Sequence, residues 1–211
     1  MQPREDINWR GVWTDEAMHR AANLRHLATN LDRLIDSGRI GSSNRYRTIQ
    51  RANALVSAYQ TLDTASDACP RSCVLELRAI AGGLVEIFGH TVGSLALSLD
   101  LQPLQLAGEK RRALLLAASE LVVNALRHAF VGRQAGSIHI ALRHDRARQE
   151  GVLVVADDGV GPGGSMDGSG HGCGIIRKLA DVLDGDATWR RSAMGGTEAS
   201  LSFPLTGSRV G

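Results

Sequence analysis

The sequence predicts an α+β protein in two parts, a helical hairpin over residues 1–67 and an α/β sandwich over residues 68–211. Apolar residues recur every three or four positions in the first part, whereas the second part mixes short apolar strands with helical segments. Residues 67–70 form the predicted linker, because Pro70 discourages a helix from continuing through it.

We expect the first helix of the hairpin to begin at Thr14, whose hydroxyl can cap its N-terminal end. Asp15 and Glu16 follow in the first turn, where the helix dipole favours carboxylates. The apolar stripe of this helix reaches Ile35, and Gly38 suits its C-terminal end. A second helix follows residues 42–44 with the same spacing. Two amphipathic helices joined by a short turn predict an antiparallel hairpin.

An isolated hairpin of this kind cannot cover its apolar stripe. Pairing with a second copy completes a four-helix bundle, so we expect a homodimer. The alternative is that the hairpin packs against the rest of its own chain.

The second part contains alternating helical and strand patterns. Helices are predicted over residues 74–89, 109–129 and 175–183, and strands over residues 94–101, 137–142, 151–156 and 198–203. The helix over 109–129 turns one set of apolar residues inward: Leu114, Leu115, Ala118, Leu121, Val122 and Ala125. This order predicts a mixed sheet covered by helices on one face.

Composition narrows the range of partners. The net charge of +2 gives no reason to expect nucleic acid or an anionic membrane as a partner, and 4% aromatic residues are too few for a base-stacking platform. Three sparse cysteines favour a reducing cytoplasm. No apolar run approaches the ~20 residues that cross a bilayer, and the charged N-terminus is not a secretory signal. We therefore expect a cytoplasmic chain without a membrane span.

The first chemical motif lies on the predicted helix over 109–129. Glu120, Asn124 and then Arg127 or His128 follow one another along one helix face. Polar groups in such an apolar helix suit a cavity that holds a metal and phosphates. The carbonyl of Asn124 is a hard oxygen ligand suited to Mg²⁺, and we expect Glu120 beside it at the metal.

The second motif ends the predicted strand over 151–156. Asp157 can accept a hydrogen bond from the exocyclic amine of adenine, while Gly159 and Gly161 allow the backbone to approach the ring. Carboxylates and glycines of this spacing also occur in ordinary turns.

The third motif is a glycine-rich loop before the last predicted helix. It contains Gly168, Ser169, Gly170, His171 and Gly172. Free N–H groups of such a loop, together with the positive end of the helix, suit a polyphosphate. His171 stands where an apolar residue is commoner, and it is a candidate for a phosphate contact.

Together and in this order, the three stretches resemble the N, G1 and G2 boxes of the GHKL ATPase superfamily, which includes histidine kinases, Hsp90, gyrase B and MutL. Residues 195–197 and 203–205 resemble the end of that domain in histidine kinases. The resemblance spans about residues 75–205. It implies the Bergerat ATP fold with ATP and Mg²⁺ bound, Asn124 on the metal, Asp157 on adenine and Thr197 at the nucleotide.

A phosphoacceptor histidine is expected in the first predicted helix. His19, with Arg20 and Asn23, resembles the His-Arg-x-x-Asn box of histidine kinases related to the HWE group. A neutral imidazole is a good nucleophile near pH 7. Glu16 can orient or deprotonate His19, and Glu120 is a rival base.

The resemblance implies a histidine kinase of a two-component system, which phosphorylates His19 and passes the phosphoryl group to an aspartate of a response-regulator receiver domain. One rival is an anti-sigma-factor serine kinase, against which His19 argues. Another is a histidine phosphotransferase relay with a decayed ATP domain. Intact Glu120, Asn124 and Asp157 disfavour decay.

Overall fold

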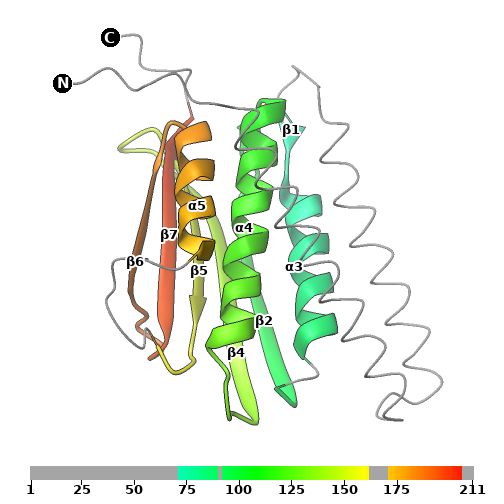
Figure 1. The fold of residues 1–211 in the computed structure, drawn as a ribbon. Helices are drawn as coiled ribbons and strands as arrows, with labels where there is room; N and C mark the ends of the chain where they lie inside the picture. The colour runs from blue at the N-terminus through cyan, green and yellow to red at the C-terminus, as the bar shows by residue number, and fades with distance from the viewer. Residues whose placement is uncertain (1–70, 90–91, 162–170, 206–211) are drawn as a thin grey trace.

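A five-stranded mixed sheet forms one layer of the described part of the chain, and three helices form the other (Figure 1). The computed structural model describes residues 71–89, 92–161 and 171–205. The predicted hairpin over residues 1–67 and the linker after it lie outside these residues.

The strands of the sheet lie in the order β2-β4-β5-β7-β6. Their bounds are β2 (Ser94–Leu101), β4 (Ala135–Asp145), β5 (Glu150–Asp157), β6 (Asp186–Arg191) and β7 (Thr197–Pro204). β2 runs parallel to β4, and every other neighbouring pair is antiparallel. Two short strands, β1 (Arg71–Ser72) and β3 (Gln105–Leu106), form a separate antiparallel pair.

All three helices cover the same face of the sheet, as the sequence predicts (Figure 1). They are α3 (Val74–Gly89), α4 (Gly108–His128) and α5 (His171–Val182). α4 lies between the other two and contacts both. Among the described helices, none combines the length and the apolar character needed to cross a bilayer.

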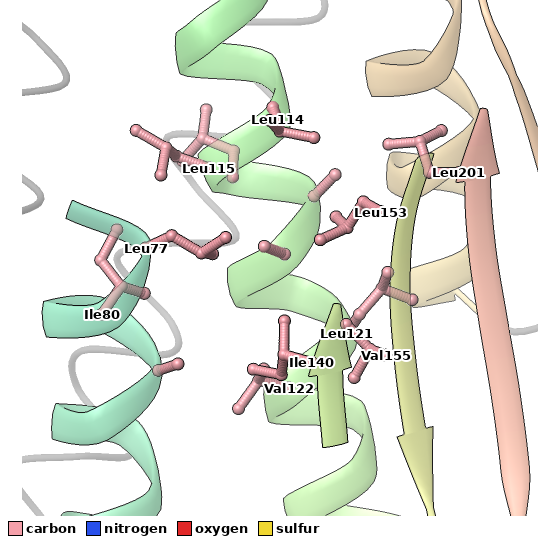
Figure 2. Packing of buried hydrophobic residues seen from close by; sticks show 14 of the residues in the cluster. Leu77, Ile80, Leu114, Leu115, Leu121, Val122, Ile140, Leu153, Val155 and Leu201 are labelled. Atoms are coloured by element: carbon pink, nitrogen blue, oxygen red, sulfur yellow. The ribbon is translucent and has the colours of Figure 1, made fainter. Parts of the chain in front are cut away.

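The core forms where α4 meets the sheet and α3. Figure 2 shows leucine and valine side chains of α4 between Leu77 and Ile80 of α3 and the apolar side chains of the central strands. All six residues of α4 predicted to face inward are buried. Burying one large apolar side chain contributes about 1.5–3 kcal/mol to the stability of the fold. The packed helix α4 therefore holds the turns that contact its ends in fixed positions.

The structure departs from the predicted elements at several points, among them the short strands β1 and β3, which have no predicted counterpart. The edge strand β6 has no predicted counterpart, because only Ala187 and Trp189 pack against the core and its other residues are exposed. Leu75, part of the predicted apolar run of α3, is 79% exposed. α5 begins at His171, four residues before the predicted start, so the last residues of the glycine-rich motif are helical.

Candidate functional site

Asp157 is a buried carboxylate at the end of β5, where it lies between β4 and β7. Asp157 is only 4% exposed. Oδ1 accepts hydrogen bonds from the backbone N–H of Gly159 at 2.9 Å and of Thr197 at 3.1 Å. Within the described residues no group donates to the other oxygen, Oδ2. One oxygen is thus fixed by backbone, and the second remains able to accept from a ligand.

Burial raises the pKa of Asp157 above its ordinary value of 3.8. The two backbone N–H groups lower this pKa in part, the neighbouring carboxylate of Asp158 raises it, and the guanidinium of Arg133 lowers it. The charged carboxylate is therefore poorly solvated. A ligand that donates an N–H group to it stabilises the charged form.

The turn after Asp157 is docked on the C-terminal end of α4. Ala129, the C-cap of that helix, accepts a hydrogen bond from the backbone N–H of Val160 at 2.9 Å. A Cβ atom on Gly159 would overlap the carbonyl and side chain of Ala129, so only glycine allows this close approach. The turn thereby satisfies one of the carbonyl groups that a helix end leaves unpaired.

The turn between β6 and β7 closes over the same place. A Cβ atom on Gly196 would overlap Oδ1 of Asp157, and Thr197 contributes its backbone N–H to that oxygen. Gly161 has a positive φ of 75°, a conformation that favours glycine, and lies beside Gly195 and Gly196. Two loops distant in sequence therefore converge on one carboxylate.

The polar stripe of α4 leads along the helix to the end on which this turn is docked. Glu120 is 6% exposed, Asn124 and Arg127 are half-buried, and His128 is exposed. Asn124 precedes Ala129 by five residues, about 7.5 Å along the helix axis. The stripe therefore runs from the core to the rim of the site that Asp157 occupies.

Two residues of this stripe, Glu120 and Asn124, carry oxygen atoms of the kind that bind magnesium. Among the described residues, no group of three or more His, Cys, Asp or Glu side chains offers a complete metal site. Mg²⁺ usually takes one or two protein oxygens and completes its coordination with waters and substrate phosphates. The carboxylate of Glu120 and the amide oxygen of Asn124 match that pattern.

The start of α5 lies at the same end of the domain. Lys110, in the first turn of α4, forms a 2.9 Å ion pair with Asp184, which follows α5. The two helices are therefore antiparallel, and the start of α5 lies toward the C-terminal end of α4 (Figure 1). The first N–H groups of a helix have no partner within it and are available to an anion.

The remaining predicted site residues lie outside the described part of the chain. These are His19 and Glu16 of the predicted hairpin and Gly168, Ser169 and Gly170 of the glycine-rich motif. Among the described residues, Asp157, Gly159 and Thr197 lie together beside Ala129 at the C-terminal end of α4, while Asn124, Arg127 and His128 lie in the last two turns of that helix and Glu120 further inside it.

Three polar residues around the turn are absent from the sequence-based site. They are Asp158, which follows Asp157, and its two hydrogen-bond partners Arg133 and Ser137. An Asp-Gly pair signals a turn, which marks Asp158 as a turn residue. Nothing in the local pattern indicates that its partners lie more than twenty residues earlier.

Comparison with known proteins agrees with this arrangement. Residues 109–207 match the family described as "Histidine kinase-, DNA gyrase B-, and HSP90-like ATPase". The chain is 27% identical over 201 residues to Blue-light-activated histidine kinase 2 of Erythrobacter litoralis, covering 90% of this chain and 56% of the relative. It is 32% identical over 115 residues to the nitrate/nitrite sensor protein NarQ of Escherichia coli, covering 54% of this chain and 19% of that protein.

A solved structure shows the same fold. The histidine kinase domain of the blue-light activated histidine kinase from Erythrobacter litoralis matches with a TM-score of 0.60 at 24% identity, covering 89% of this chain and 94% of that chain. The chain spans little more than half the length of the first relative named above, and a smaller share of the second.

Proposed function

We propose, from the premise that residues 109–207 belong to the histidine kinase-, DNA gyrase B-, and HSP90-like ATPase family, that the chain is the catalytic core of a sensor histidine kinase. The relative that aligns over most of this chain is named a histidine kinase. The observation that supports the proposal is the convergence of Asp157, Gly159 and Thr197 at the C-terminal end of α4, around a carboxylate with one oxygen still able to accept.

In this proposal ATP lies across that end of α4. Oδ2 of Asp157 accepts the exocyclic amine of adenine, while Gly159, Gly161 and the backbone of Thr197 shape the pocket around it. The opposite end of the nucleotide, the triphosphate, faces α4 and the start of α5.

The triphosphate is bound by charge and by backbone N–H groups. Arg127 and His128 supply positive or donor groups from α4. The glycine-rich motif supplies backbone N–H groups from Gly168, Ser169, Gly170, His171 and Gly172. Ser169 and His171 also supply their side chains. Glu120 and Asn124 would hold Mg²⁺, which supplies charge neutralisation on the phosphate oxygens.

His19 is the proposed nucleophile. A ring nitrogen of its neutral imidazole attacks the γ-phosphorus, the bond to the β,γ-bridging oxygen breaks, and ADP leaves. Glu16, one helical turn before His19, takes the ring proton or orients the ring, with Glu120 as the rival base. The phosphoryl group then passes to an aspartate of a response-regulator receiver domain.

The proposal extends to organisation. Residues 1–67 form the helical hairpin that pairs with a second copy as a four-helix bundle, and residues 68–211 form the ATP-binding domain. Phosphoryl transfer depends mainly on positioning and charge neutralisation. A separate ATP domain that delivers the γ-phosphate to a helix-borne histidine meets both needs, and we place this reaction in the cytoplasm.

Incubation of the chain with γ-labelled ATP and Mg²⁺ tests the proposal. We expect label that is lost in acid, because phosphohistidine is acid-labile whereas phosphoserine is not. His19→Ala should abolish labelling but leave ATP binding by calorimetry unchanged. The matched control is His26→Ala, seven residues further along the same predicted helix, which should label normally.

Other outcomes contradict the proposal and point elsewhere. Acid-stable label would favour a serine kinase of the anti-sigma-factor type. Failure to bind ATP·Mg²⁺, with phosphate still accepted from a phosphorylated receiver domain, would favour a phosphotransferase relay. Label that survives His19→Ala would show that the acceptor is wrong.

A further inference from the structure

Asp158, the residue after the buried carboxylate, ties its turn to the start of β4. Its Oδ1 accepts the backbone N–H of Ser137 at 2.8 Å, and its own N–H donates to the carbonyl of Ser137 at 3.3 Å. The guanidinium of Arg133 donates a hydrogen bond to the carbonyl of Asp158. The side chain and the backbone of Asp158 thus both bond to one segment, residues 133–137.

These bonds begin where the sheet ends. Ile138 opposite Asp157 is the last paired position of β4 and β5 on this side, and the chain turns away immediately afterwards. The hydrogen bonds between Asp158 and Ser137 extend the pairing of β4 and β5 by one residue beyond this last paired position. On its other side the turn is held by Val160, whose N–H donates to Ala129.

The anchored turn sets the direction of the Asp157 side chain. Oδ1 of Asp157 accepts from Gly159, which is inside the turn, and from Thr197, which is outside it. If the turn moves, these two donors no longer coincide on one oxygen and Oδ2 changes direction. A hydrogen bond to a ligand weakens steeply as its geometry departs from linear.

We propose that Asp158 is a positioning residue that aims Oδ2 of Asp157 at the nucleobase and thereby sets the preference for adenine, an inference that rests on the proposed function. Adenine presents an amine donor at the position where guanine presents a carbonyl acceptor. A well-aimed carboxylate favours the donor and repels the acceptor, so the preference depends on its direction.

Nucleotide preference separates positioning from a general loss of structure. We expect Asp158→Ala to weaken ATP·Mg²⁺ binding roughly three- to tenfold, the effect of losing one ordinary hydrogen bond, because Asp158 acts on the ligand only through Asp157. Binding of GTP·Mg²⁺ should change much less, so the ratio of the two affinities falls. The labelling rate at saturating ATP should stay near wild type, because His19 and the phosphate-binding groups are untouched.

Asp158→Asn is the rescue variant. Its amide oxygen can still accept from Ser137, but its charge is gone. We expect this variant to retain most of the preference for ATP, because the role of Asp158 is geometric. Loss of preference as complete as in Asp158→Ala would overturn the proposal.

Asp145 provides a matched control at the opposite end of β4. Its Oδ1 accepts the backbone N–H groups of Ala147 at 3.0 Å and Arg148 at 3.2 Å, in the turn between β4 and β5. Asp145→Ala therefore removes a similar carboxylate anchor far from the site. Its ratio of ATP to GTP affinity should match wild type.

A second variant keeps the proposal testable if Asp158→Ala does not fold. Arg133 is exposed, and Arg133→Ala removes the hydrogen bond to the Asp158 carbonyl together with a positive charge that acts on Asp157, while the side chain of Asp158 keeps its bond to Ser137. We expect a smaller fall in the same ratio. A wild-type chain that prefers ATP, with both variants equally selective, would overturn this inference alone. A wild-type chain that binds no nucleotide would remove the proposed function together with it.

Discussion

At the scale of single residues, the candidate site holds a buried carboxylate, Asp157, at the end of β5. Burial raises the pKa of Asp157 above 3.8, so its ionised form opposes folding. The stability that the protonated form contributes is fully present below pH 3.8 and is lost as the pH rises through the raised pKa of the folded state. Near neutral pH the folded chain keeps this unfavourable buried charge. A role in the fold alone does not explain why the charge is kept.

Asp157→Asn should therefore separate stability from binding. The amide oxygen still accepts from Gly159 and Thr197, while the charge is removed. We expect the variant to match wild type in thermal unfolding near pH 3.5 and to exceed it at pH 7, because only the wild type carries the buried charge there. ATP·Mg²⁺ affinity should fall more than about tenfold, since the amide presents a donor to the adenine amine.

Calorimetric titration and unfolding scans across this pH range measure both effects. Asp145→Asn, at an exposed turn, is the control and should change neither. An Asp157→Asn chain that is less stable than wild type at pH 7 would show that the two backbone N–H groups outweigh the burial of the charge.

At the scale of elements, the site depends on how a turn meets a helix end. Gly159 has no space for a side chain because the backbone of Ala129 lies against it. We expect Gly159→Ala to lower the free energy of unfolding by about 1–3 kcal/mol, the usual effect of overpacking, and to weaken ATP binding as the turn shifts from α4. Denaturant unfolding and calorimetric titration give the two values.

Gly82 in α3 is the control for this substitution. A Cβ atom there meets nothing within 4 Å, and the residue lies inside a helix. Gly82→Ala should raise the free energy of unfolding by about 0.5–1 kcal/mol, because alanine favours the helix more than glycine does. Equal destabilisation by both substitutions would contradict the docking of the turn.

Elements with a strong period could be predicted, and those without one could not. α3, α4 and β2 follow from their apolar spacing, because each buries one face against the core. β6 was missed because its polar–apolar alternation rests on Ala187 and Trp189 alone, which is too short a pattern to mark a strand by itself. The two-residue strands β1 and β3 are too short for any period.

Across the whole molecule, the sequence predicted the motifs of the candidate site but not the bonds that hold them in place. Asp157 and the glycines were visible as motifs because their residue types are unusual for a strand end. The bonds of Asp158 to Ser137 and Arg133 were not visible, because they depend on which loops become neighbours in the fold. The roles of His19 and Glu16 stay predictions, since both lie outside the described residues.

The predicted dimer is a property of the whole chain and not of the ATP-binding domain by itself. If the apolar stripe of the first predicted helix is buried between two copies, Leu31→Asp places a charge in that interface and should yield a monomer in sedimentation analysis. Asn30→Asp, one residue off the stripe, introduces the same side chain and should stay dimeric. ATP binding should survive in both, because every described residue of the candidate site lies after residue 108.

Labelling distinguishes the dimer from the alternative in which the hairpin packs on its own chain. In a four-helix bundle, His19 depends on the partner helices for its position, so Leu31→Asp should lose most autophosphorylation while Asn30→Asp keeps it. A wild-type chain that sediments as a monomer and still labels on His19 would remove the dimer and leave the ATP site intact. The two halves of the molecule would then be coupled within one chain.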